Sequence, residues 1–269
     1  MDLSFLIDQE GVGTCSNINL LIDLLKGDKK NPIQVTIRPM TGYSECIIDE
    51  AERLYLAKLI NDKKVKVYSH SPFSINLCAT PVNSWNIRLL TDELIKSSEM
   101  NFKGVVVHCG KRTNLLEDVA TKNQIDNLVI VEHTYENMLK QKKMDLNIMK
   151  SCPILLETPA GQGTEICYNI EEMCRVFKKA RSEMRYPEHM KVCIDTCHVF
   201  AAGYDPIEYI NSWEYMCPDS IGLVHFNGSR DVRGSKIDRH EFKESKLLHD
   251  DLKKVYDHCR LHDIPMLSE

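Results

Sequence analysis

The sequence alternates between short apolar runs and longer segments in which apolar residues recur at helical spacing. Eight of the short runs are rich in β-branched and other apolar residues. Near-continuous apolar composition is typical of strands in a parallel sheet that helices cover on both faces. The predicted strands are residues 3–7 (LSFLI), 33–38 (IQVTIR), 65–69 (VKVYS), 104–108 (GVVVH), 153–157 (PILLE), 192–195 (VCID), 222–226 (GLVHF) and 264–269 (IPMLSE).

The segments between these runs predict helices. Ser44 is a candidate cap for the second helix, and the Thr-Pro pair at 80–81 is a favourable entry to the third. Residues 126–141 are ambiguous because NLVIV could be a ninth strand, and we favour a helix since it leads into HTYENMLKQ. The predicted helices are residues 17–26, 44–62, 80–102, 126–141, 171–184, 206–215 and 246–262.

The alternation of strands and helices runs through all 269 residues without a linker or a low-complexity break. Such a repeat predicts one α/β domain over residues 1–269, a single (β/α)8 TIM barrel, which typically takes ~250 residues. The sequence stops at the eighth strand, so we expect a barrel that lacks its last helix. A doubly wound open sheet is the alternative, but no GxGxxG or phosphate-loop motif supports it.

Composition indicates a protein with a sizeable core, since 43% of the residues are hydrophobic and the mean hydropathy is −0.30. There is no run of ~18 apolar residues that could span a membrane, and the start, MDLSFLIDQEG, lacks the basic flank of a signal peptide. The eleven cysteines include no CxxC pair, a pattern typical of free thiols in a reducing compartment. We therefore expect an intracellular protein, cytoplasmic or nuclear, and not a secreted one.

The formal net charge of −5 argues weakly against nucleic-acid binding, for which a basic surface is the usual sign. The argument fails if the protein holds several divalent cations. Three such ions would add six charges, taking −5 to about +1 and concentrating the positive field at their site. Net charge therefore does not exclude a DNA-binding protein.

Metal-capable side chains stand where six of the eight predicted strands end. In a parallel barrel the carboxyl ends of the strands converge on one mouth, where catalytic groups gather. Asp195 and His198 are three residues apart at one such end, and Asp238 and His240 are two apart downstream of another. The full set comprises five imidazoles and four carboxylates: His70, His108, Glu157, Asp195, His198, His225, Asp238, His240 and Glu269.

Each of these residues alone has an ordinary structural explanation. A lone histidine after a strand is more often a hydrogen-bonded structural residue, and a lone acid is often the cap of the next helix. Nine such residues cannot all be caps, and four carboxylates in one cleft would repel each other without cations. The set therefore predicts a polynuclear metal site, and imidazole with carboxylate suits Zn²⁺, with Mn²⁺ and Fe²⁺ as competitors. Two or three ions match nine ligands.

Two further groups of residues are interpreted as structural. The other five histidines lie in predicted helices or loops, and we expect them to be solvated: His133, His189, His249, His258 and His262. Cys109 and Cys197 lie near the predicted ligands in the sequence. We expect Cys197 to face away from Asp195 and His198 into the barrel wall.

Several strings of the sequence resemble the endonuclease IV family of zinc-dependent abasic-site DNA repair enzymes, also called AP endonuclease family 2. They are YSHSPFSINL, ILLETPAGQGTEI, KVCIDTCHVFAAGYD, LVHFNGSRDVRGSKIDRHE and IPMLSE, in consistent order from about Val65 to Glu269. The resemblance implies hydrolysis of the phosphodiester 5′ to an abasic site, which leaves a 3′-hydroxyl and a 5′-deoxyribose phosphate. It also makes a 3′-phosphodiesterase activity plausible.

The resemblance further implies three zinc ions and a role for each predicted ligand. His70, His108 and Glu157 would hold the first ion, and His198, Asp238 and His240 the third. The second would be held by four residues: Glu157, Asp195, His225 and Glu269. Glu157 would bridge the first two ions and serve as the catalytic carboxylate, with a bridging hydroxide as nucleophile. The implied partner is double-stranded DNA containing abasic sites, and we expect a monomer.

Candidate DNA contacts follow from position. Phe73 occupies the place of the aromatic residue that this family puts shortly after the first histidine, and it could stack in a distorted duplex. Arg38 is a candidate for penetrating the DNA. Basic residues beside the ligands could contact phosphates: Lys111, Arg112, Arg230, Arg233, Lys236 and Arg239.

The sequence departs from the family at its N-terminus, where LIDQEGVG replaces the usual glycine-histidine-valine-serine string, and after KIDRHE, where a glycine-rich run is absent. A divergent relative, of viral type and even virion-associated, would fit these changes. Two other functions stay open. A sugar isomerase or epimerase on the same barrel would need only one or two metals, and a DNA-lesion binder would bind without turnover.

Overall fold

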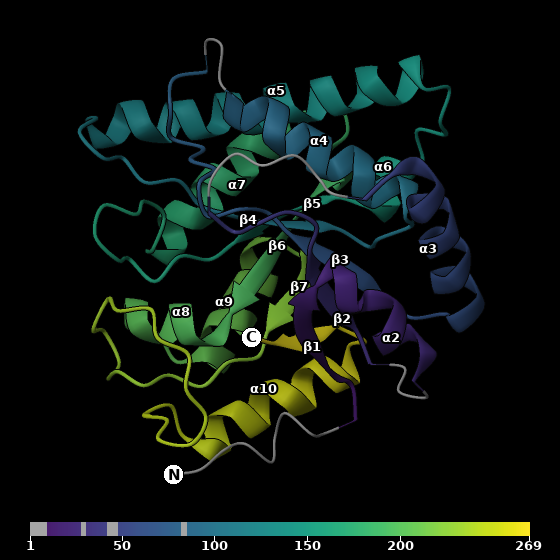
Figure 1. Ribbon diagram of the computed structural model, residues 1–269. Coiled ribbons are helices and arrows are strands. Elements are labelled where there is room, and N and C mark those ends of the chain that lie inside the picture. The colour runs from purple at the N-terminus through teal and green to yellow at the C-terminus, as the bar shows by residue number, and fades with distance from the viewer. Residues whose placement is uncertain (1–9, 28–30, 42–47, 82–84) are drawn as a thin grey trace.

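The chain folds into a closed barrel of eight parallel strands, in chain order from β1 to β8 (Figure 1). The computed structural model describes residues 10–27, 31–41, 48–81 and 85–269. The strands are β1 Val12–Asn17, β2 Ile33–Thr36, β3 Val67–His70, β4 Val105–His108, β5 Ile154–Glu157, β6 Met190–Asp195, β7 Ile221–His225 and β8 Met266–Ser268. The predicted TIM barrel is confirmed.

The first strand is not the one that the sequence predicts. Residues 3–7 lie outside the described residues, and β1, with the sequence VGTCSN, pairs with β2 on one side and β8 on the other. Only Val12 and Gly13 of this strand are buried. A search for apolar runs misses such a strand, because little of its own surface is apolar and buried. Hydrogen bonds to its two neighbouring strands hold it in place.

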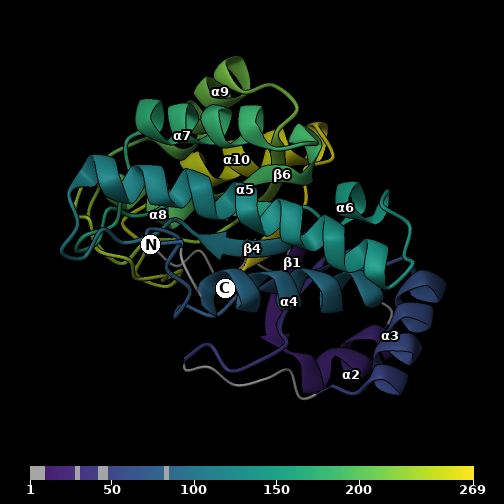
Figure 2. The same cartoon turned by 90° about the horizontal axis from the view of Figure 1, so that it is seen from above.

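Helices surround the barrel in both views (Figures 1 and 2). They are α2 Leu21–Lys26, α3 Glu50–Lys63, α4 Trp85–Glu99, α5 Glu117–Gln141, α6 Ile148–Ser151, α7 Ile170–Glu183, α8 Thr196–Ala202, α9 Pro206–Met216 and α10 His249–Leu261, with 3-10 turns η1 Ile18–Leu20 and η2 Pro187–His189. The run NLVIV lies within α5, so a ninth strand is excluded there. Among the described residues, none of the helices is long and apolar enough to cross a membrane.

Helix starts follow local capping rules where they are described. Asp49 begins α3 through a capping box, accepting from the Glu52 amide while the Glu52 side chain accepts from the Asp49 amide. The predicted cap at Ser44 lies outside the described residues. The sequence pattern does not predict α6 or α8. These helices have only 4 and 7 residues, which is too short for apolar residues to repeat visibly at helical spacing.

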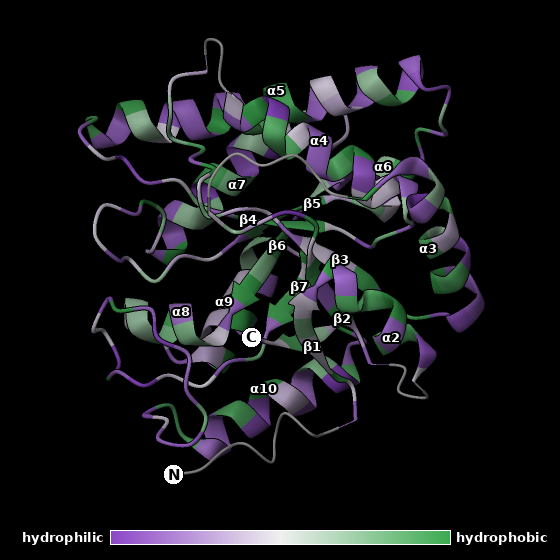
Figure 3. Ribbon diagram, in the orientation of Figure 1, coloured by the Kyte–Doolittle hydropathy of each residue, from purple (hydrophilic) through white to green (hydrophobic). Residues whose placement is uncertain are grey.

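The barrel interior holds a layer of buried side chains directly beneath the predicted ligands. Six strands contribute one residue each to this cluster: Tyr68, Val106, Leu155, Cys193, Leu223 and Leu267. Successive side chains of a strand alternate in direction, so residues two positions further on point the same way. Those positions are His70, His108, Glu157, Asp195, His225 and Glu269. Figure 3 shows hydrophobic residues along the central strands, at whose ends these candidate ligands lie.

Candidate metal centre

Donor atoms of the predicted ligands converge at the carboxyl ends of the strands. One group is His70, His108 and Glu157, whose ligand atoms all lie within 4.8 Å of one another. A second group meets the same limit and consists of Glu157, Asp195, His225 and Glu269. Strand pairing aligns them, because His108 is in register with Glu157 and Asp195 with His225.

Glu157 divides its two carboxylate oxygens between these groups. Its Oε2 lies 2.9 Å from His108 Nε2 and 3.3 Å from His70 Nε2. Its Oε1 lies 2.8 Å from His225 Nδ1. The side chain is 1% exposed, so neither oxygen is committed to solvent. This is the geometry expected of a carboxylate that bridges two metal ions.

A third group forms around Asp238. Its Oδ1 lies 3.2 Å from His198 Nε2 and 3.2 Å from His240 Nε2. Both imidazole nitrogens are buried and make no hydrogen bond within the described part of the chain. Buried polar atoms almost always have a partner, so two bare nitrogens facing one carboxylate oxygen fit a cation held by all three residues.

Asp195 combines two roles that the sequence leaves as alternatives. Its Oδ1 accepts from the His198 amide at 2.8 Å and so caps α8. Its Oδ2 faces the cluster, 3.7 Å from His225 Nδ1 and 3.6 Å from His240 Nε2. Gly203 ends α8 in the left-handed conformation, with φ of 113°. The short helix α8 thus fixes Asp195, a candidate ligand, and directs His198 toward the same cluster.

Hydrogen bonds to the second ring nitrogen orient two of the imidazoles. His70 Nδ1 lies 2.8 Å from the Ser71 carbonyl, and His198 Nδ1 lies 2.8 Å from the Thr158 carbonyl. A carbonyl only accepts, so the Nδ1 atom carries the proton in each ring. The Nε2 atoms, which face the carboxylates, are then the nitrogens available to a metal ion, as in metal-binding histidines.

Opposite charges within the cluster shift the pKa values of its buried carboxylates and imidazoles. Burial would raise the pKa of Glu157, but the charges of His108 and His225 outweigh it and hold this pKa well below its usual range. Burial would likewise lower the pKa of His198, but Asp195 and Asp238 raise it well above the ordinary value. His198 therefore holds its second proton more tightly than a free imidazole does, and metal binding at Nε2 would release that proton.

Three polar residues that the sequence analysis did not single out support this centre. Gln34 on β2 contacts His225 and Glu269. Asn227 donates to Asp195 Oδ2 at 2.7 Å and accepts from the Glu269 amide at 2.9 Å. Thr158 Oγ1 accepts from the Asp195 amide at 3.0 Å. The only signal for Gln34 is a polar residue inside the apolar run IQVT.

Two structural interpretations from the sequence are wrong. The Cys197 sulfur does not turn away into the barrel wall, because it lies within 4.8 Å of ligand atoms of Asp238 and His240. Burial raises the pKa of this thiol to about 12, which keeps it protonated. His189 is not solvated: its side chain is 7% exposed and its Nδ1 lies 3.1 Å from Glu132 Oε1.

Arg38 is also placed differently from the prediction. Its side chain is 3% exposed, with Nε 2.7 Å from Glu93 Oε2 and Nη2 2.6 Å from Asp92 Oδ2. Both carboxylates belong to α4. The buried guanidinium, held by two acids, ties the segment that follows β2 to α4 and is not presented to DNA, so the assignment of Arg38 as a DNA-penetrating residue is corrected.

Phe73 is the exposed aromatic residue beside the centre. It is 58% exposed, and its ring centroid lies 5.1 Å from that of His108 and 5.7 Å from that of His70. The predicted basic residues are exposed in neighbouring loops: Lys111, Arg112, Arg230, Arg233, Lys236 and Arg239. Some already have partners, since Arg233 Nε donates to the Gly203 carbonyl and Lys236 Nζ lies 4.0 Å from the Tyr168 ring centroid.

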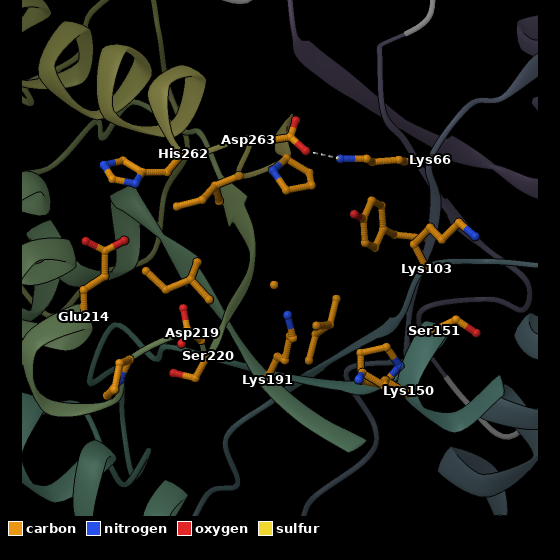
Figure 4. A pocket seen from close by; sticks show the side chains of 18 residues that line it. Lys66, Lys103, Lys150, Ser151, Lys191, Glu214, Asp219, Ser220, His262 and Asp263 are labelled. Carbon is orange, nitrogen blue, oxygen red and sulfur yellow. Dashed lines mark hydrogen bonds and ion pairs between the residues drawn. The ribbon is translucent and has the colours of Figure 1, made fainter. Parts of the chain in front are cut away.

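A cavity of about 670 Å³ opens at the opposite end of the barrel, where the strands begin. Lys66, Tyr68, Lys191 and Asp263 are among the residues that line it, and Lys66 Nζ lies 3.4 Å from Asp263 Oδ2 (Figure 4). None of the nine predicted ligands lines this cavity. At this end of a TIM barrel, side chains usually serve stability, so the chemistry is assigned to the other mouth.

Comparisons with known proteins agree with this geometry. A family model described as a xylose isomerase-like TIM barrel matches residues 46–258. A probable endonuclease 4 of Acholeplasma laidlawii is 30% identical over 251 residues, which is 90% of this chain and 77% of that protein. A probable endonuclease 4 of Geotalea daltonii is 30% identical over 70% of this chain, which spans 64% of that relative's length.

Solved structures share the fold. Endonuclease IV from Thermus thermophilus superposes with a TM-score of 0.73 at 20% identity, covering 96% of this chain and 91% of that one. A D-tagatose 3-epimerase-like protein gives a TM-score of 0.66 at 13% identity, covering 96% of this chain and 89% of that one. With its family-model match and its relatives, the chain belongs to the endonuclease IV family.

Proposed function

We propose that this protein hydrolyses the phosphodiester on the 5′ side of an abasic site in double-stranded DNA, leaving a 3′-hydroxyl and a 5′-deoxyribose phosphate. Family membership supports an abasic-site endonuclease. The observation that carries the proposal is the division of the Glu157 oxygens, one toward His70 and His108 and the other toward His225. A sugar isomerase or epimerase with one or two metals would not need nine converging donors.

Three zinc ions are the proposed cofactor. The first would be held by His70, His108 and Glu157, the second by Glu157, Asp195, His225 and Glu269, and the third by His198, Asp238 and His240. Imidazole nitrogens and carboxylate oxygens suit zinc. Such ions would activate a water molecule and offset the charge that develops on the phosphate.

Residues of this chain would position the metal ligands and the DNA. Glu157, Asp195 and His225 are each at most 1% exposed, so bulk water is largely excluded from the part of the site around these three residues. The carbonyls of Ser71 and Thr158 hold two imidazoles with the binding nitrogen directed inward. Exposed Phe73, beside His70 and His108, is suited to stack against the bases that flank an abasic gap.

A cleavage assay tests the proposal. Zinc-loaded protein is incubated with an end-labelled duplex that contains one tetrahydrofuran abasic analogue, and the products are resolved on a denaturing gel. We expect a single cut 5′ to the analogue, no cut in the undamaged duplex, and loss of cutting in Glu157→Ala. Intact abasic duplex at enzyme excess would contradict the endonuclease function, and full cutting by Glu157→Ala would contradict the role of the bridging carboxylate.

A further inference from the structure

Gln34 occupies an unusual position for a polar side chain. It lies on β2 in register with Tyr68, one of the residues of the buried interior layer, and is 2% exposed. An unpaired amide at such a place would destabilise the fold. Both the nitrogen and the oxygen of its side-chain amide have hydrogen-bond partners. Nε2 donates to Glu269 Oε1 at 2.7 Å, and Oε1 lies 2.9 Å from His225 Nε2.

The chemistry of its partners fixes which way round this amide lies. An ionised carboxylate only accepts hydrogen bonds, so the NH₂ group must face Glu269. The amide oxygen then faces His225, and because this oxygen also only accepts, His225 Nε2 must carry the proton. Nδ1 is then the nitrogen left for a metal ion, and it lies 2.8 Å from Glu157 Oε1 and 3.3 Å from Glu269 Oε2.

His225 therefore binds through the nitrogen opposite to that used by His70 and His198. In those two rings backbone carbonyls accept from Nδ1, and Nε2 faces the carboxylates. In His225 the Gln34 side chain on β2, 191 residues away in sequence, accepts from Nε2 instead, so that Nδ1 faces the carboxylates. The same amide engages Glu269 Oε1, which leaves Oε2 as the oxygen directed toward His225.

We infer that Gln34 is a positioning residue for the second metal position: it selects the His225 tautomer and sets the orientation of the Glu269 carboxylate. The inference rests on the proposed metal centre. Groups that orient metal ligands typically change metal affinity 10- to 100-fold when removed. Gln34→Met keeps the length of the side chain but removes the hydrogen bonds to His225 and Glu269. Gln34→Glu can still accept from His225 while it loses the donor to Glu269.

The test measures zinc and the imidazole proton rather than activity. Wild-type and variant proteins are loaded with zinc and titrated with a chelator, and the His225 Nε2–H signal is followed by NMR. We expect Gln34→Met to lose that signal and to release one ion per chain about 10- to 100-fold more readily. Gln34→Glu should keep the signal but also release the ion more readily, because two carboxylates then face each other.

Two results separate the failure of this inference from that of the proposed function. If Gln34→Met retains both the wild-type zinc affinity and the His225 Nε2–H signal, the positioning role is refuted while the metal centre stands. If the wild-type protein binds no zinc, the proposed function itself fails. Metal-free unfolding in urea serves as the folding control, and Gln34→Glu provides the second variant should Gln34→Met not fold.

A separate observation concerns two cysteines outside the barrel. Cys174 on α7 and Cys217 directly after α9 are 5% and 4% exposed, and their sulfur atoms lie 3.0 Å apart. This separation is shorter than a van der Waals contact between two sulfurs. The helices that carry them pack against each other. Both are free thiols in the structure.

We propose that Cys174 and Cys217 are a modification site that a low-molecular-weight disulfide can oxidise. The two thiols would form one S–S bond, and their two electrons and two protons would reduce one glutathione disulfide to two glutathione thiols. Burial raises the pKa of Cys217 to about 12, so the thiolate is scarce and the reaction should be slow. The product would join α7 to α9.

Peptide mapping tests this pairing. The protein is incubated with glutathione disulfide, alkylated, digested without reductant and analysed by mass spectrometry. We expect a Cys174–Cys217 crosslinked peptide, lost in Cys217→Ser and retained in Cys152→Ser, which alters a buried cysteine elsewhere. The crosslink should also raise the melting temperature reversibly. Recovery of both cysteines as alkylated thiols, or pairing of either with a different cysteine, would overturn the proposal.

Discussion

Removal of Arg38 should destabilise the fold rather than weaken DNA binding. In Arg38→Ala, Glu93 would keep its hydrogen bond from Ser69 but lose the guanidinium that neutralises it. The Glu93 side chain is 0% exposed, so water cannot replace that partner. Breaking a buried ion pair from one side costs about 3–5 kcal/mol. Asp92, with 36% of its side chain exposed, should add little because solvent screens it.

Urea unfolding followed by circular dichroism measures this change. Arg38→Met combined with Glu93→Leu should recover most of the loss, because the pair is then replaced by apolar groups of similar size. Lys26→Ala breaks an exposed pair with Asp23 and should change the free energy of unfolding by no more than about 1 kcal/mol. If Arg38→Ala unfolds like the wild type but binds abasic DNA more weakly, the reasoning is refuted and the sequence-based role of Arg38 is restored.

The contribution of Asp92 should depend on pH. Burial would raise the pKa of Asp92, but hydrogen bonds from Lys96 and Arg38 outweigh it and lower this pKa below the ordinary value of 3.8. The folded state therefore holds the proton less tightly than the unfolded state. Its contribution to stability is complete above pH 3.8 and is lost as the pH falls through the lowered pKa. Arg38→Ala should weaken this acid dependence.

Three further predictions concern individual side chains. Phe73→Ala should weaken binding of an abasic duplex by about 1–3 kcal/mol in a fluorescence anisotropy titration, whereas Tyr215→Ala, which removes a 90% exposed ring on α9, should not. His189→Ala should lower the free energy of unfolding by about 1–3 kcal/mol, since it removes a buried partner of Glu132; an equal loss in His133→Ala, whose side chain is 46% exposed, would contradict this. Glu157→Ala should lose two of three bound zinc ions by metal analysis, and unchanged content would exclude it as a shared ligand.

The sequence predicts which metal-capable side chains converge because a simple rule places them. In a parallel barrel, the residue that ends each apolar run points into one mouth, and this is where His108, Glu157 and His225 lie. The same reasoning misses β1, whose strand is set by its neighbours rather than by its own apolar residues. The intracellular location and the monomeric state stay predictions.

The remaining errors concern long-range partners, which no local pattern encodes. Arg38 in RPMTGY looks like an exposed loop cation, and its partners Glu93 and Asp92 lie 54 or more positions away. Similarly, His189 is buried by Glu132, 57 residues earlier. The partners of Gln34 in the candidate centre, His225 and Glu269, come close to it only when the barrel closes. Local sequence identifies which residues can do chemistry, while closure of the barrel decides which of them meet.

The zinc content of the purified, zinc-loaded protein tests the central claim most directly. The nine converging donors should retain three ions per chain after dialysis, measured by inductively coupled plasma mass spectrometry against protein concentration. His70→Ala and Asp238→Ala should each lose one ion, from the first and third positions respectively. Less than about one ion per chain in the wild-type protein would contradict the metal centre and the mechanism built on it.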